Sequence, residues 1–138
     1  MIGILSASEI EEILRQNRLG RLAICTASFP YVVPITYAYD GQAVFGFSGP
    51  GQKIENMRAQ PNVALLVDEI RTPTHWKSVI VEGIYDEVID PAERMQASSI
   101  IMSRTRQLVT RGLSDEPGLV LFRIMPERKS GRFESGSH

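Results

Sequence analysis

The sequence VFGFSGPGQKIENMRAQPNVALLV, residues 44–67, contains the strand, loop and helix signals from which the rest of the fold is predicted. A predicted strand, Ala43–Phe47, leads into a loop of Ser, Gly and Pro at 48–51. A short helix is predicted at Gln52–Ala59, because a Gly-rich loop precedes it and a proline follows it. Val63–Val67 then reads VALLV, which is apolar on both faces and typical of a central strand.

The loop before this helix has the properties of a phosphate site. The first N–H groups of a helix have no carbonyl partner within the helix, and the helix dipole makes that end partly positive. Lys53 adds a full positive charge at the start of the helix, and Ser48 adds a hydroxyl at the start of the loop. We therefore expect the loop to bind a phosphate group.

The remaining segments predict a small antiparallel barrel. Six strands are expected: Leu22–Ala27, Tyr31–Tyr39, Ala43–Phe47, Val63–Val67, Trp76–Ile89 and Gly118–Met125. Three helices are expected: one that includes Ile10, Ile13 and Leu14, then Gln52–Ala59, and then Pro91–Arg106 with Asp90 as its N-cap. Asp40-Gly41 is typical of a type I′ hairpin turn, and Gly83 is expected to bend the longest strand. Short turns and a long bent strand favour a closed barrel, mainly β with short helices, in one domain of residues 1–138.

Three local features give further expectations. Ser8 and Glu11 have the spacing of a capping box, and Gly20 is expected just past the end of the helix that they begin. Pro34 lacks an N–H group, so its strand is expected to lie at an edge, at a bulge or open to a ligand there. Residues 128–133 predict a polar tail after the last strand.

Composition excludes several classes of protein. A net charge of −1 over 138 residues gives no electrostatic basis for a nucleic-acid partner. Cys25 is the only cysteine, and the two histidines, His75 and His138, have no metal-ligand spacing, so neither a disulfide nor a metal site is expected. No apolar run approaches the ~18 residues of a membrane span, and the N-terminus lacks the basic flank of a signal peptide. We expect a soluble, cytoplasmic protein with no membrane partner.

The loop at 48–53 also resembles the P-loop of nucleoside triphosphatases. However, Gln52 separates Gly51 from Lys53, and Ile54 stands where a magnesium-binding hydroxyl is required. P-loop folds also need parallel strands joined by crossover helices, whereas the turns here predict hairpins. We therefore set this interpretation aside.

Three segments resemble one known family. They are PYVVPITYAYDG (30–41), GPGQKIENMRAQPNVALLVDE (49–69) and WKSVIVEG (76–83), and they occur in the order found in pyridoxamine 5′-phosphate oxidase-like flavoproteins. The chain most resembles the nitroimidazole-resistance-type branch, from about its first helix to Gly131-Arg132. The resemblance implies a six-stranded split β-barrel that forms a homodimer and binds FMN at the subunit interface.

The resemblance also implies which residues contact FMN. Lys53, Ser48 and Ser78 would hold the phosphate. Lys77 is a further cation, although it points to the opposite face of the strand from Ser78. Trp76 would pack against the cofactor. The backbone that would line the flavin ring belongs to Val33, Pro34, Ile35 and Thr36.

The sequence departs from the family pattern in two places. Residues 128–133 lack the Arg/Trp/His substrate motif of true pyridoxamine phosphate oxidases, so vitamin B6 oxidation is not expected. The histidine that commonly precedes the loop in the nitroimidazole-resistance branch is replaced by Gly46 or Phe47, and no catalytic acid or base stands out. We expect an FMN-dependent oxidoreductase acting on an unidentified small acceptor. The alternatives are the same fold with a deazaflavin or haem, and a flavin-binding protein without turnover.

Overall fold

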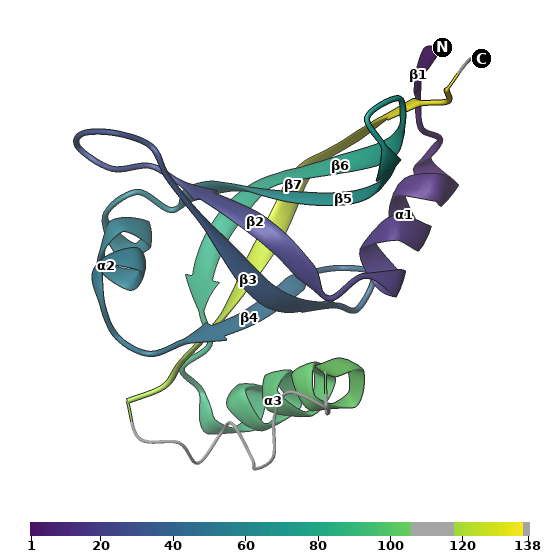
Figure 1. The fold of residues 1–138 in the computed structure, drawn as a ribbon. Helices are drawn as coiled ribbons and strands as arrows, with labels where there is room; N and C mark the ends of the chain where they lie inside the picture. Colours follow the sequence, from purple (N-terminus) through teal and green to yellow (C-terminus); the bar gives the residue numbers. More distant parts are fainter. Residues whose placement is uncertain (106–117, 137–138) are drawn as a thin grey trace.

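The computed structural model describes residues 1–105 and 118–136. Within them, seven strands form an antiparallel sheet in the order β1-β7-β4-β3-β2-β5-β6, and a pairing of β6 with β7 closes six of them into a barrel (Figure 1). The strands are β1 (Ile2–Ile4), β2 (Leu19–Ile24), β3 (Tyr31–Tyr39), β4 (Val44–Ser48), β5 (Asn62–Thr72), β6 (His75–Glu87) and β7 (Val120–Glu134). The helices are α1 (Ala7–Gln16), α2 (Gln52–Ala59) and α3 (Pro91–Thr105). The expected mainly β barrel with three short helices is confirmed.

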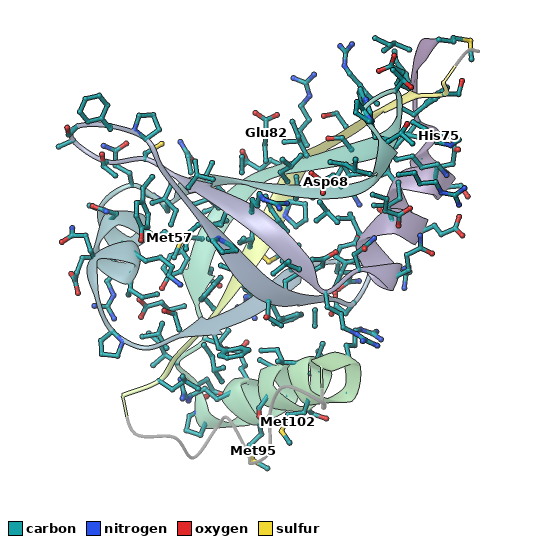
Figure 2. All side chains as sticks on the ribbon, in the orientation of Figure 1. Met57, Asp68, His75, Glu82, Met95 and Met102 are labelled. Carbon is teal, nitrogen blue, oxygen red and sulfur yellow. The ribbon has the colours of Figure 1, made fainter. Side chains whose placement is uncertain are left out.

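One face of each barrel strand fills the interior. Tyr37, Leu65, Val79 and Phe122 are buried there because side chains alternate across a strand and every second residue is apolar. Helices α1 and α2 lie at opposite ends of the barrel (Figure 1). Met57 of α2 is fully buried and points toward the barrel (Figure 2). Helix α3 instead covers the outside of β3 and β4 through a second apolar cluster.

The first helix begins two residues earlier than its sequence predicts. Ser6, not Ser8, is the N-cap: its hydroxyl accepts the Glu9 N–H at 3.2 Å, and the Glu9 carboxylate accepts the Ser6 N–H at 2.9 Å. The two possible capping boxes overlap in sequence, and only the earlier one puts apolar residues both before the cap (Leu5) and at the fourth helical position (Ile10). Both side chains are buried in the main core, so this hydrophobic staple selects the earlier start.

Strand pairing also extends the predicted strands. Gly20 does not follow the helix end but lies inside β2, while Asn17 is the C-cap of α1. Residues 128–133 are not a polar tail, because they continue β7 and pair with β6. Residues 2–4 add β1, a further strand beside the end of β7. Residues 128–133 are mostly polar and residues 2–4 are only three, so the strand structure of both comes from a ladder partner that is distant in sequence.

The β3–β4 turn differs from the prediction as well. Gly41 has a φ of 97°, and no other residue of the described turn has a positive φ, whereas a type I′ turn needs two. The Asp40 carboxylate accepts the N–H groups of Gln42 and Ala43, both at 2.8 Å, and this local bonding stabilises the alternative turn. The predicted bend at Gly83 is confirmed by a register shift between Glu82 and Gly83. The predicted end of α3, Arg106, lies outside the described residues.

Candidate functional site

Half of β3 has an open edge. The strand pairs with β2 from Tyr31 to Thr36, but it pairs with β4 only from Tyr37 to Tyr39. The Tyr37 N–H donates to the Arg18 carbonyl on the β2 side at 2.8 Å. Because backbone groups alternate in direction along a strand, those of Thr36 and Pro34 point to the open side. Pro34 therefore lies at an edge, as expected, and no ladder N–H is lost there.

The strand that would have covered this edge turns away. After Gly46, β4 continues to pair with β7 but no longer with β3, and Ser48 ends it opposite Val120. Residues 49–51 then lead into α2 on the same side of β3. The barrel is thus split between β3 and the loop that carries the predicted phosphate site.

The N-terminus of α2 has the donors that the sequence predicted. Gly51 is the N-cap and supplies no side-chain hydrogen bond. The first helical bond runs from the Glu55 N–H to the Gly51 carbonyl, so the preceding N–H groups of the first turn have no helical acceptor. A Cβ atom built on Gly49 or Gly51 would meet no atom within 4 Å, which shows that the loop backbone is accessible. Free N–H donors and an accessible backbone are the properties of an anion-binding site.

Side chains at the loop are available for a ligand. Lys53 is half-buried and has no salt-bridge partner among the residues that the structure describes. The Ser48 hydroxyl donates to the Gly49 carbonyl at 2.9 Å, a local bond that a stronger acceptor can replace. Ser48 and Lys53 therefore flank one loop, as the sequence predicts.

An ion-pair network holds α2 in place. Arg58 donates to Glu87 of β6 and also to Glu55 within the helix. The hydrogen bond from Arg58 is the main reason that the pKa of Glu87 lies below its ordinary value. The Tyr85 hydroxyl donates to the same carboxylate at 2.9 Å, and burial is the main reason that the pKa of Tyr85 is raised. This anchoring positions the helix N-terminus relative to the barrel.

The other predicted cofactor residues lie at the opposite end of the barrel. Trp76 donates its indole N–H to Glu134 at 3.1 Å, and Ser78 lies between Asp68 and Arg132 in the sheet. Arg132 is twelve positions beyond Val120, the partner of Ser48, or about 40 Å of strand at roughly 3.3 Å per residue. The structure therefore does not bring Ser78 to the loop of Ser48 within one chain, and Lys77 and Trp76 lie at the same far end.

Near the end of β7 lies Arg132, for which the sequence predicted no position in the sheet. Arg132 stands directly opposite Ser78 on the outer face and is exposed. Only the long-range pairing of β6 with β7 places it there, since a polar stretch has no alternation that predicts a strand. Among the described residues no group of three potential metal ligands occurs, and no helix there is long and apolar enough to span a membrane.

Comparison with known proteins identifies the family. A family model described as pyridoxamine 5′-phosphate oxidase matches residues 6–133, nearly the whole chain. The chain belongs to this oxidase family. A curated relative from Rhizobium meliloti, an uncharacterised protein, is 38% identical over 122 residues, which cover 84% of this chain and 80% of that protein.

Two solved structures show the shared fold. An FAD-binding protein of Mesorhizobium loti is 42% identical and superposes with a TM-score of 0.81, covering 98% of this chain and 99% of that one. A putative 5-nitroimidazole antibiotic resistance protein of Bacteroides thetaiotaomicron superposes with a TM-score of 0.79 at 21% identity, covering 96% of this chain and 87% of that one. The second likeness concerns the fold alone.

Proposed function

We propose that this oxidase-family protein binds FMN between the open edge of β3 and the loop before α2, and that it is an oxidoreductase that passes electrons from the flavin to a small acceptor. The observation that carries the proposal is the split beside Pro34. It leaves backbone groups of β3 without a β4 partner where β4 departs toward the loop before α2, and the N-terminus of that helix has no side-chain cap. A flavin presents a ring with hydrogen-bonding edges at one end and a dianionic phosphate at the other. The open edge of β3 matches the ring, and the N-terminus of α2 matches the phosphate.

The residues have separate tasks in this proposal. Lys53, Ser48 and the first N–H groups of α2 hold the phosphate. The backbone of Pro34 and Thr36 contacts the polar edge of the ring, while the β3 residues beside them line its face. The flavin, when bound, supplies the redox chemistry, so the protein needs no catalytic acid or base of its own. Its residues need only orient the cofactor and the acceptor.

The Mesorhizobium loti relative supports a flavin as the cofactor, because it is an FAD-binding protein by name and is 42% identical over nearly the whole chain. FAD carries the same ring and adds a second phosphate and an adenosine. A mass spectrum of the cofactor released from the purified protein distinguishes FMN from FAD, and also from a deazaflavin or haem.

A homodimer completes the proposal. The strand register places large apolar side chains on the outer face of the sheet, and all of them are exposed: Ile2, Ile4, Leu19, Val32, Ile70 and Ile80. Exposed large apolar side chains on one face of a sheet favour a subunit interface there. Since Trp76, Lys77 and Ser78 are far from Lys53 within one chain, we propose that they reach the cofactor from the second copy.

Titration with FMN tests the proposal. Lys53→Ala is expected to weaken FMN binding by about ten- to a hundredfold, the effect of losing a charge-assisted hydrogen bond of about 1.5–3 kcal/mol. Lys53→Arg keeps the charge and is expected to recover most of the affinity, and Arg18→Ala removes an exposed cation elsewhere as a matched control. Bleaching of the bound flavin by a nicotinamide donor and its recovery in air would separate an oxidoreductase from a passive binder. Unchanged affinity in Lys53→Ala would contradict the proposed site.

A further inference from the structure

Helix α2 carries one acidic residue, and this residue lies close to the proposed phosphate site. Glu55 is in the first turn, directly after the N–H groups at 52–54 that have no helical acceptor. Side chains of a helix point back toward its N-terminus, and the positive end of the helix dipole attracts a carboxylate. A free Glu55 carboxylate would therefore compete with a phosphate for the same end of the helix.

Arg58 engages this carboxylate in the structure. Its Nη1 donates to Glu55 Oε2 at 3.0 Å, across one turn of the helix. Residues three positions apart on a helix are neighbours on its surface, so the pair forms without distortion of the backbone. An arginine side chain also stays charged at every pH at which proteins are folded, so this partner is always present.

The guanidinium of Arg58 is itself fixed by the barrel. Its Nε donates to Glu87 Oε1 at 2.5 Å, and its Nη2 donates to Glu87 Oε2 at 3.4 Å. Glu87 ends β6, and its carboxylate also accepts the Tyr85 hydroxyl at 2.9 Å. One edge of the planar guanidinium is thus used on a strand residue, and the remaining nitrogen is directed at Glu55. A lysine has no such fork and could not connect the two carboxylates in one fixed geometry.

Stability alone does not account for the contact with Glu55. The side chains of Arg58 and Glu55 are 47% and 62% exposed, and pairs as exposed as this contribute little to folding. Ile54 and Met57, both fully buried in the main core, already dock α2 on the barrel. The contact has a clearer effect on charge, because it keeps the carboxylate from the free N–H groups and from Lys53.

We propose that Arg58 is a positioning residue for phosphate binding, which ties Glu55 to the barrel through Glu87 and keeps the helix N-terminus open for the anion. This inference rests on the proposed binding of the cofactor phosphate at the loop before α2. It adds a residue one turn beyond the loop that sets the preference of the site for a phosphorylated flavin.

A comparison of FMN with riboflavin tests the inference. Riboflavin is FMN without the phosphate, so the ratio of the two dissociation constants measures the contribution of the phosphate alone. Both are titrated into the full-length protein in its native oligomeric state, with flavin fluorescence as the signal. Arg58→Gln is expected to weaken FMN binding by about three- to tenfold, since the released carboxylate then occupies the helix end. Riboflavin affinity is expected to change by less than about twofold, whereas a general distortion of α2 would weaken both ligands.

Glu55→Gln separates positioning from a simple sum of charges. In the parent protein it is expected to change FMN affinity by less than about twofold, because Arg58 already holds the carboxylate. In the Arg58→Gln background it is expected to restore FMN affinity to within about twofold of the parent. Arg104→Gln removes an exposed arginine of α3 and serves as the control, with no effect expected.

The outcomes are distinct. An equal gain from Glu55→Gln with and without Arg58 would show that the charges act independently, and it would overturn the proposal. A large gain from Glu55→Gln in the parent protein overturns it as well, and this measurement does not depend on the folding of any Arg58 variant. Equal losses of FMN and riboflavin affinity in Arg58→Gln also overturn it. If the parent protein binds FMN no more tightly than riboflavin, the proposed phosphate site is itself wrong, and the role of Arg58 falls with it.

Discussion

A mixture of two defective variants tests whether two copies of the chain share each cofactor site. Lys53→Glu reverses the charge at the loop before α2, and Ser78→Asp places a negative charge at the opposite end of the barrel. These positions are separated by most of the length of β7. If both contact one phosphate, each must come from a different copy.

The expected magnitudes follow from charge and symmetry. Lys53→Glu removes a charge-assisted hydrogen bond of about 1.5–3 kcal/mol and adds repulsion, so FMN affinity should fall by about a hundredfold or more. Ser78→Asp adds repulsion at a half-buried position, worth about 1–2 kcal/mol after solvent screening, or about tenfold. When the two variants are mixed equally and exchange subunits, half of the dimers contain one copy of each. Every such dimer has one intact site and one site with both changes, so about one site in four should bind FMN normally.

The assay measures the stoichiometry of tight FMN binding before and after subunit exchange, with quenching of flavin fluorescence as the signal. A mixture of Lys53→Glu with Ser48→Asp is the matched control, because both residues flank the same loop and every site in the mixed dimer then keeps one defect. A shared site predicts recovery in the first mixture and none in the control. Absence of recovery in the first mixture, or equal recovery in both, would refute the shared site.

Three further predictions concern stability. Tyr37→Phe removes the bond from the fully buried hydroxyl to the Leu14 carbonyl at 2.9 Å and should lower the free energy of unfolding by about 1–2 kcal/mol, seen as a melting temperature lower by about 3–8 °C. The pKa of Glu87 is lowered in the fold, so its stabilising effect is present above the ordinary pKa of 4.5 and is lost as the pH falls through the folded pKa. The variant Glu87→Gln lacks this carboxylate. In urea unfolding it should therefore lose less stability than the parent protein when the pH is lowered below 4.5. Gly83→Ala should destabilise by about 1–3 kcal/mol, because the new Cβ meets the Met125 carbonyl, whereas Gly49→Ala should be nearly neutral, and similar melting of the two variants would contradict the close approach at the bulge.

Local signals predicted part of the fold accurately. The bounds of β3 and α2, Tyr31–Tyr39 and Gln52–Ala59, are those that the sequence predicts. Pro30 and Asp40 flank β3, while Gly51 precedes α2 and Pro61 follows shortly after it, and the effects of such residues on the backbone depend on immediate neighbours. By contrast, β1 and the second half of β7 were missed. Their residues are polar or few, and they form strands because β6 and the end of β7 offer free ladder groups.

For the candidate site, the sequence by itself determined the chemistry of the loop before α2. Ser48, Lys53 and the glycines at 49 and 51 lie within six residues of one another, so a helix start with free donors and a cation follows from local conformation alone. Only the tertiary structure decided how the other residues are arranged. Register along β7 carries Ser78 to the far end of the barrel, and the end of β6 brings Glu87 to Arg58 of α2. The reason is physical: hydrogen-bond register between distant strands depends on the closure of the whole barrel, and no stretch of neighbouring residues contains it.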